Sequence, residues 1–291
     1  MAEAERVLYA AHLRRTVEIF AILTDARVVP RPGSAADREL SEARGCALGE
    51  GIWGEAPVRT AYAAALMSYT AALDEALAIA AVLTGGTQTA IPVVVLARSL
   101  AETASQAWWL LEPGTAARGR VERLQCLRLR SAIEGEQAAA ADGVSEADWP
   151  EYTETQEYVR QYSRRLGLDS PARDRWAYIC GGQRLPSARH RIADMLGDVG
   201  VDAAYNIHSG FAHGEIFALW QGFEQSADGQ LCRPVVKKPT LLGAVAVAAR
   251  ALYCPAQRLA DLYGLDQFEL DGWVDEHDEV TRSGQAVDEA S

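Results

Sequence analysis

Hydrophobic positions recur along this chain in long alanine-rich segments, and no such segment alternates with the period of two that a half-buried strand requires. Alanine also has the highest intrinsic helix propensity. The pattern therefore predicts an all-α fold, in the form of a single multi-helix bundle. Prolines, glycines and capping residues bound the long helices, which we expect at about residues 4–23, 57–83, 89–113, 115–141, 145–167 and 239–263, followed by a final acidic helix that frays after Asp278.

Shorter elements lie between these helices. Ser170-Pro171 and Pro186-Ser187 each predict the start of a short helix, and Asp202 predicts the cap of another one. Asp228-Gly229 is a hairpin signal between two apolar stretches, so a small β-hairpin near residues 217–236 is the alternative to a helix there. The Pro- and Gly-rich stretch over residues 30–54 predicts a long connection that is either a lid or disordered.

The domain organisation is predicted to be simple. No internal repeat is visible, and no linker is polar enough to require a split. We expect one helical domain over residues 1–280 and a disordered tail over residues 281–291.

Hydrophobic residues make up 49% of the chain, which is enough for a substantial core. The apolar stretches are too short for a membrane span of roughly 20 residues, because Leu241–Ala249 is followed by Arg250 and the stretch from Tyr62 reaches Asp74. Acidic residues stand at the N-terminus, where a signal peptide has a basic region. These features predict a cytoplasmic protein without a membrane partner.

Composition also restricts the chemistry. The five cysteines are scattered and form no CxxC pair, which argues against a disulfide framework and a structural zinc site. A net charge of −12 disfavours indiscriminate nucleic-acid binding. However, 13 of the 26 arginines lie between Arg118 and Arg191, a stretch whose net charge is +2. These arginines either pair with carboxylates on a solvated surface or form a groove for phosphate or carboxylate groups.

A polar stripe covers residues 205–215. Tyr205, Ser209 and His213 recur at intervals of four and would share one helical face, while His208 and Glu215, seven apart, would share another. Glycines 210 and 214 would each cost about 1 kcal/mol inside a helix. This combination indicates either a hydrogen-bonded seam between helices or a functional site.

A second polar group stands in the apolar segment from Val93 to Leu111. Arg98 and Glu102 are four residues apart and can pair on one helical face, either locking two helices together or serving a cavity. If the two groups converge, the candidate catalytic residues are Glu102, Tyr205 and His213. The candidate ligand-binding residues are Arg98, Arg123, His208, Ser209 and Glu215.

Cofactor motifs are absent from the sequence. No Glu-x-x-His pair of a helical di-iron site, glycine-rich phosphate loop, dinucleotide fingerprint or serine-hydrolase elbow occurs. No cofactor or metal is therefore expected, although a site built from Glu102, His213 and Glu215 stays an alternative.

The chain resembles a group of uncharacterised bacterial helical proteins in which an Arg-x-x-x-Glu helix precedes an arginine-containing helix and a Tyr-x-x-x-Ser-x-x-x-His helix. The first matching pair is Arg98 and Glu102. The remaining matches are Arg118, Arg123, Tyr205, Ser209 and His213. These proteins are similar to the HEPN superfamily of helical bundles, many of which are toxin or defence ribonucleases.

The HEPN ribonuclease signature is an arginine followed four to six residues later by a histidine. His213 has no arginine at those upstream positions. Arg184 and His190 have the required spacing, but Pro186 between them indicates a helix start and not one continuous helix. The resemblance therefore implies a bundle fold more strongly than a nuclease activity.

Three functions remain open at this point. The first is a HEPN-like, homodimeric protein acting in a defence, toxin or nucleic-acid-linked process, with RNA or a small anionic ligand as partner. The second is a small-molecule enzyme of bacterial specialised metabolism, with a pocket between the Glu102 and His213 helices. The third is a non-catalytic interaction module. Whether the chain is an enzyme is not decided by its sequence.

Overall fold

The computed structural model describes residues 3–25, 28–48, 51–85, 89–143, 154–174, 177–197, 210–215, 218, 222–225 and 232–286. These residues are mostly helical, which confirms the all-α class. The chain groups into two compact units: a larger one of residues 1–29, 65–111 and 188–291, and a smaller one of residues 30–64 and 112–187. The single domain predicted for residues 1–280 stays a prediction.

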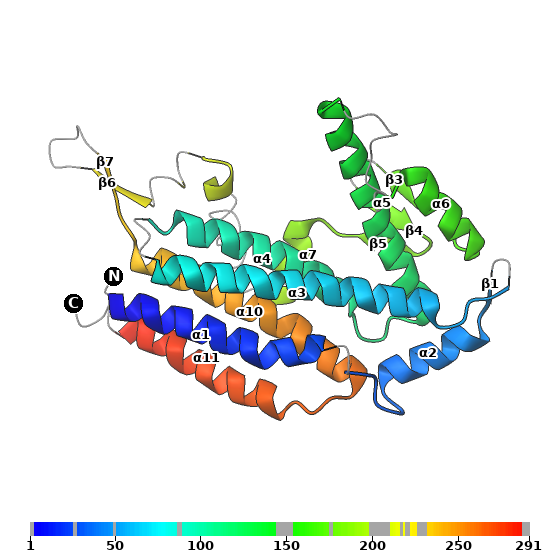
Figure 1. Ribbon diagram of the computed structural model, residues 1–291, viewed down its shortest axis with the longest axis horizontal. Helices are drawn as coiled ribbons and strands as arrows, with labels where there is room; N and C mark the ends of the chain where they lie inside the picture. Colours follow the sequence, from blue (N-terminus) through cyan, green and yellow to red (C-terminus); the bar gives the residue numbers. More distant parts are fainter. Residues whose placement is uncertain are drawn as a thin grey trace. The chain divides into compact units, whose positions relative to one another are not determined.

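The larger unit is a helical bundle (Figure 1). Its elements are α1 (Glu3–Ala21), the short 3-10 helix η1 (Ile22–Thr24), the C-terminal part of α3 (Ala56–Thr84), α4 (Ile91–Leu110), α7 (Ala188–Leu196), α10 (Lys238–Tyr263) and α11 (Phe268–Ala286). The long helices were predicted at these places, and α7 follows Pro186-Ser187 as expected. The final helix, α11, continues past residue 281, where the tail is predicted to begin.

Helix α10 is central to the larger unit, where it packs against α1, α4, α7 and α11. Pro239 stands in its first turn, where the missing N–H costs nothing, and Gly264 ends it with a left-handed φ of 67°. The side chains that α10 buries are mostly small, with Ala244, Ala248 and Ala251 fully buried. Small residues let neighbouring helices approach closely. Alanine therefore favours both the helical conformation of α10 and its close packing against other helices.

Two helices, α3 and α10, are long and apolar enough to cross a membrane by length and composition. Within the windows that meet this criterion, 39% of α3 and 56% of α10 is buried inside the protein. Core helices of soluble proteins meet the same criterion, so this finding is weak evidence for a membrane span. The absence of a membrane partner therefore stays a prediction.

The predicted β-hairpin is present. Strands β6 (Phe223–Gln225) and β7 (Cys232–Pro234) pair antiparallel, with Phe223 opposite Pro234. The hairpin signal at Asp228-Gly229 was therefore interpreted correctly as a chain reversal, although these two residues lie outside the described part of the chain.

The smaller unit is organised around α5 (Ala117–Ala141), which packs against two shorter helices and a small sheet. The other elements of this unit are α2 (Ala35–Gly45), β1 (Ala47–Leu48), β2 (Gly51–Ile52), α6 (Gln156–Arg165), β3 (Ala172–Asp174), β4 (Ala177–Cys180) and β5 (Gln183–Leu185). Helix α6 ends at a left-handed Gly167, as predicted. Residues 144–153, where that helix was expected to begin, lie outside the described residues.

The short helix predicted after Ser170-Pro171 is wrong, because Ala172–Asp174, Ala177–Cys180 and Gln183–Leu185 form an antiparallel sheet in the order β3-β4-β5. The strands β4 and β5 are joined by Gly181-Gly182, and Gly181 has a left-handed φ of 55°. A Cβ atom at Gly181 would overlap the carboxylate of Glu122. The double glycine is a hairpin signal that outweighs the Ser-Pro helix start.

The lid or disordered connection predicted for residues 30–54 is also wrong, because most of the described part of it is ordered secondary structure. Ser34 caps α2 by accepting a hydrogen bond from the Asp37 N–H at 3.2 Å. Ala47 and Ile52 then pair in the β1–β2 ladder. Ser34 is a helix-capping residue type, but the prolines and glycine just before it favour a loop, so the helix was not predicted.

Candidate functional site

The Arg98–Glu102 pair predicted in α4 is confirmed. Arg98 Nε donates to Glu102 Oε1 at 2.8 Å, and the two side chains are 15% and 33% exposed. The helix is amphipathic around them, since Val94, Ala97 and Leu100 face the core. The pair therefore stands at the border between the core and solvent, where its charges stay partly hydrated.

A third acidic residue that sequence reasoning missed, Glu75, lies beside this pair. It comes from α3, and its Oε1 accepts a hydrogen bond from the Ser99 hydroxyl at 2.6 Å. Burial raises the pKa of Glu75, the negative charge of Glu102 adds to that effect, and the bond from Ser99 opposes it. An acid within the alanine-rich segment after Tyr62 was the available signal. The larger unit thus holds two carboxylates in different surroundings, one paired with an arginine and one partly buried.

The 205–215 stripe is only partly described. Tyr205, His208 and Ser209 lie outside the described residues, so their predicted roles stay predictions. His213 and Glu215 are both exposed.

Gly214 ends the helical turn at residues 210–212 and does not lie inside a helix, contrary to the expectation above. It has a left-handed φ of 69°, its N–H donates to Phe211 O at 3.2 Å, and the next N–H, of Glu215, donates to Gly210 O at 2.8 Å. This pattern is a Schellman motif, in which glycine is favoured and not costly. The predicted helical face that joins His208 to Glu215 is therefore wrong at its C-terminal end.

Arg123 serves a structural connection in the smaller unit. Its Nε donates to Gln183 Oε1 at 2.8 Å, and one of its terminal nitrogens lies 3.4 Å from Glu112 Oε2. Burial lowers the pKa of Arg123, and the charge of Glu112 raises it. The guanidinium thus links α5 to β5, which leaves it less suited to the ligand-binding role predicted for it.

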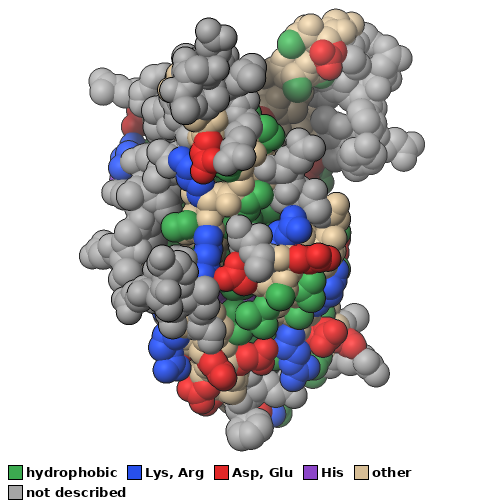
Figure 2. All heavy atoms as spheres, turned by 90° about the vertical axis from the view of Figure 1, so that its left-hand side faces the viewer, with side chains coloured by type: hydrophobic (Ala, Val, Ile, Leu, Met, Phe, Trp, Pro, Cys, Tyr) green, Lys and Arg blue, Asp and Glu red, His purple; other side chains and the backbone are tan. Residues whose placement is uncertain are grey.

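Most other arginines of α5 and α6 also have carboxylate partners. Within 4 Å of a glutamate oxygen lie Arg118, Arg120, Arg123, Arg128, Arg130 and Arg164. Basic and acidic side chains also lie next to one another on the left-hand side of Figure 1, which faces the viewer in Figure 2. Six of the twelve described arginines between Arg118 and Arg191 therefore form ion pairs, as in the first of the two interpretations that the sequence left open.

Arg160 is different, and it lines a polar pocket of about 500 Å³ in the smaller unit. Its Nη2 donates to the neutral amide oxygen of Gln156 at 3.0 Å, and its charge is one of the weaker causes of the lowered pKa of Glu157, after the hydrogen bonds from Gln161 and Arg164. Arg173 lines the same pocket, with its guanidinium carbon 5.8 Å from the centre of the Tyr178 ring. The remaining lining residues are Ile133, Gln137, Gln156, Ser170, Pro171 and Ala172.

The pocket surroundings are arranged by α5, α6 and the segment that leads into β3. Glu136 of α5 accepts a hydrogen bond from the Gln156 N–H at 2.8 Å, so its charge is directed to the first turn of α6. Among the described residues that line the pocket there are two guanidinium groups and no carboxylate. This is the arrangement that binds phosphate or carboxylate groups in proteins.

Metal chemistry has no geometric support in the described part of the chain. There, no group of three or more histidine, cysteine, aspartate or glutamate side chains is placed to hold a metal ion. The site from Glu102, His213 and Glu215 that the sequence left open is therefore not assembled.

No protein-family model, curated protein or solved structure matches this chain. The functional argument accordingly depends on the geometry of its own residues.

Proposed function

We propose that this protein is a HEPN-like helical binding protein whose smaller unit takes a small anionic ligand in the pocket of Arg160 and Arg173. The observation that carries the proposal is the contrast among arginines. Six of them lie within 4 Å of a glutamate oxygen, whereas Arg160 donates to the neutral amide of Gln156 and lines the same pocket as Arg173. A bidentate anion is the ligand that such a pair of planar donors suits.

Size and charge favour a small anion over a long RNA. The pocket holds about 500 Å³, within the usual range for a small-molecule site. The smaller unit has 15 arginines and 17 acidic residues. It therefore lacks the excess of positive charge with which proteins bind an extended phosphate backbone. A nucleotide fits these limits and would link the protein to a nucleic-acid-related process.

Ribonuclease activity is not part of the proposal. Arg184 lies in strand β5 and His190 in helix α7, so these two residues do not share the single helix of the HEPN signature. The homodimeric state, the bacterial origin and the cytoplasmic location stay predictions.

The double variant Arg160→Gln, Arg173→Gln is expected to bind the ligand at least tenfold more weakly. A hydrogen bond to a charged group contributes about 1.5–3 kcal/mol, and about 1.4 kcal/mol corresponds to tenfold. Isothermal titration calorimetry with adenosine monophosphate, ribose 5-phosphate, inorganic phosphate and a short single-stranded RNA measures this. The matched control is Arg130→Gln, which removes a half-exposed arginine of α5 that pairs with Glu134.

The salt dependence separates the two ligand classes. A small anion contacts few charged groups, so its affinity decreases only slightly as the ionic strength rises. RNA binds through several phosphates, so its affinity decreases steeply. Equal loss of binding in Arg130→Gln and in the double variant would contradict a specific pocket. Absence of binding for all four probes would remove the proposal, and a steep slope with RNA alone would replace the small ligand by RNA.

A small-molecule enzyme is the second candidate, and the Glu75–Glu102 arrangement favours it. Carboxylates whose surroundings differ are a common basis for dividing acid and base roles. Here Glu75, with its raised pKa, is suited to hold a proton, and Glu102 pairs with Arg98. Ser99, which is exposed and bonds to Glu75, would be the group nearest to solvent and substrate.

Glu75→Gln is expected to remove a pH-dependent loss of stability. Because the pKa of Glu75 is raised in the folded state, the native protein binds more protons than the unfolded chain from pH 4.5 upward to the raised pKa. Wild-type stability therefore decreases as pH rises through that window. Urea unfolding of both proteins between pH 4 and pH 8 measures the difference, with Glu134→Gln as control. An identical pH dependence of wild type and Glu75→Gln would show that Glu75 has an ordinary pKa and would remove the basis for this candidate.

A further inference from the structure

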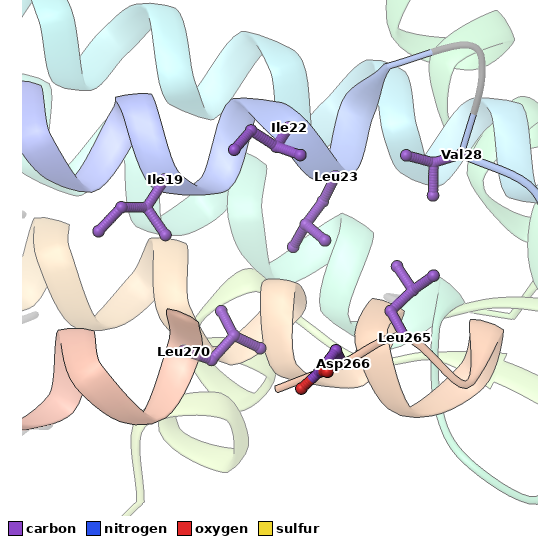
Figure 3. Close-up of a pocket in the computed structure, with 7 residues that line it drawn as sticks. All are labelled: Ile19, Ile22, Leu23, Val28, Leu265, Asp266 and Leu270. Carbon is purple, nitrogen blue, oxygen red and sulfur yellow. The ribbon is translucent and has the colours of Figure 1, made fainter. Parts of the chain in front are cut away.

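An apolar pocket of about 370 Å³ opens in the larger unit, between the end of α1 and the start of α11 (Figure 3). Figure 3 shows Leu23 pointing from the α1–η1 segment toward the chain that carries Leu265 and Leu270. The pocket is lined by Ile19, Ile22, Leu23, Val28, Leu265, Asp266 and Leu270. It lies in a different unit from the anion pocket and contributes nothing to it.

Six of the seven lining residues are aliphatic, and none is aromatic. Ile19 is 8% exposed and forms part of the wall, whereas Ile22 is 55% exposed. Flexible aliphatic walls suit a linear hydrocarbon chain, since they offer dispersion contacts along its length without a flat surface for a ring. Pockets of this volume and lining are the usual form of small-molecule sites.

The charged residues around the pocket indicate which polar head group the ligand carries. Asp266 is the one ionisable residue in the described lining, and it is exposed. Asp261 and Asp271, close to it in the chain, are exposed as well. The larger unit carries 13 basic and 23 acidic residues, a net charge of −10. A carboxylate or phosphate head group would meet this negative field, whereas an ammonium group would be attracted by it.

We propose that this pocket binds an amphiphilic cation: an aliphatic chain fills the space between α1 and α11, and an ammonium group lies at the mouth beside Asp266. The inference goes beyond the anion-binding function proposed above and is independent of it, because the two ligands have opposite charge and use different residues. Loss of one binding activity leaves the other intact.

Calorimetric titration with a matched ligand series tests the chemistry. The probes are hexyl-, octyl- and decylammonium, octanoate and 1-octanol, each below its micellar concentration. Burying a methylene group is worth about 0.8 kcal/mol, so affinity is expected to rise about fourfold for each added methylene until the pocket is full. Octylammonium is expected to bind tightest of the three eight-carbon probes and octanoate weakest. Octanoate binding as tightly as octylammonium overturns the proposal, and so does the absence of any chain-length dependence.

Paired substitutions locate the site. Ile22→Trp fills the mouth and is expected to weaken octylammonium at least tenfold, whereas Leu77→Trp alters a similarly exposed aliphatic residue on α3 and is expected to leave binding unchanged. Asp266→Asn is expected to reduce the preference for octylammonium over 1-octanol about two- to fivefold, and Asp74→Asn, at an exposed acid of α3, to leave it unchanged. If Ile22→Trp and Leu77→Trp behave alike, the chain does not bind in this pocket; if Asp266→Asn and Asp74→Asn behave alike, the ammonium group does not lie beside Asp266. Either result shows that the proposal is wrong. Because Asp266→Asn keeps the size of an exposed side chain, its effect on the preference for octylammonium tests the proposal even if Ile22→Trp fails to fold.

Discussion

Glu39→Gln is expected to lower the free energy of unfolding by about 3–5 kcal/mol, the usual cost of leaving a buried charge without its partner. Arg120 is fully buried in the smaller unit, with an exposed fraction of 0%, and the Glu39 side chain is 10% exposed. Nε and Nη2 of Arg120 donate to the two carboxylate oxygens of Glu39 at 2.6 Å each. Glutamine offers one oxygen and turns an N–H₂ group toward the guanidinium, so the positive charge of Arg120 stays buried and uncompensated.

Tyr62 completes this network and supplies a graded comparison. Its hydroxyl donates to Glu39 Oε2 at 2.6 Å, and the guanidinium carbon of Arg120 lies 5.3 Å from the centre of its ring. Tyr62→Phe removes one hydrogen bond to a charged group and is expected to cost about 1.5–3 kcal/mol. The double variant Glu39→Leu, Arg120→Met removes both charges and is expected to cost less than Glu39→Gln alone.

Urea unfolding followed by circular dichroism measures these differences, and hydrogen exchange of the α5 peptides shows whether the smaller unit opens first. The control is Glu134→Gln, which breaks an ion pair between Arg130 and Glu134 whose side chains are 32% and 54% exposed. Such surface pairs are worth about 0–1 kcal/mol. A cost for Glu39→Gln no larger than that of the control would show that the buried network does not stabilise the smaller unit.

Acidification from pH 6.5 to about 4 is expected to lower the free energy of unfolding by roughly 3 kcal/mol, because a buried histidine pair must take up protons. His12 Nε2 and His277 Nδ1 lie 3.0 Å apart between α1 and α11. Burial lowers the pKa of His277 to about 4, and the charge of His12 adds to the effect. Burial also lowers the pKa of His12, while Glu276, 3.8 Å away, raises it.

The sign follows from proton uptake. Between the two pKa values of His277 the unfolded chain binds a proton that the native protein does not, so stability rises with pH across this window and is lost as pH falls. Of the remaining charged groups, Asp278 raises the pKa of His277 and Arg250 lowers it. Trp273 stacks on the His277 ring with a centroid distance of 4.8 Å and donates to Thr16 Oγ1 at 2.9 Å, so the pair cannot gain water without disturbing the packing of α11.

Replacing His277 by glutamine isolates this contribution. Thermal and urea unfolding of the variant between pH 4 and pH 7 is expected to show a flatter pH dependence than wild type. His190→Gln, which changes an exposed histidine of α7, is expected to keep the wild-type slope. An equal slope in wild type and His277→Gln would mean that other groups cause the acid sensitivity.

The sequence predicted the long helices well and the short strands and buried polar groups poorly. The long helices were predicted because their determinants are local: alanine-rich runs, Pro239 in the first turn of α10 and glycines after the last one. The Arg98–Glu102 pair was predicted for the same reason, since both residues lie one turn apart on α4. The strands β3 to β5 were not predicted because they have only three or four residues each, and because Ser170-Pro171 is locally a helix-start signal.

The polar groups with the largest expected effects could not be paired from the sequence. Glu39 and Arg120 are separated by 81 positions, and His12 and His277 by 265. Nothing local distinguishes Arg120, which is buried, from Arg130, which is half-exposed, although both stand on α5. Helix positions follow from neighbours in the chain, because propensity and capping act over a few residues. Which charges become buried, and which meet, depends on how distant helices pack, so it emerges only once the chain has folded.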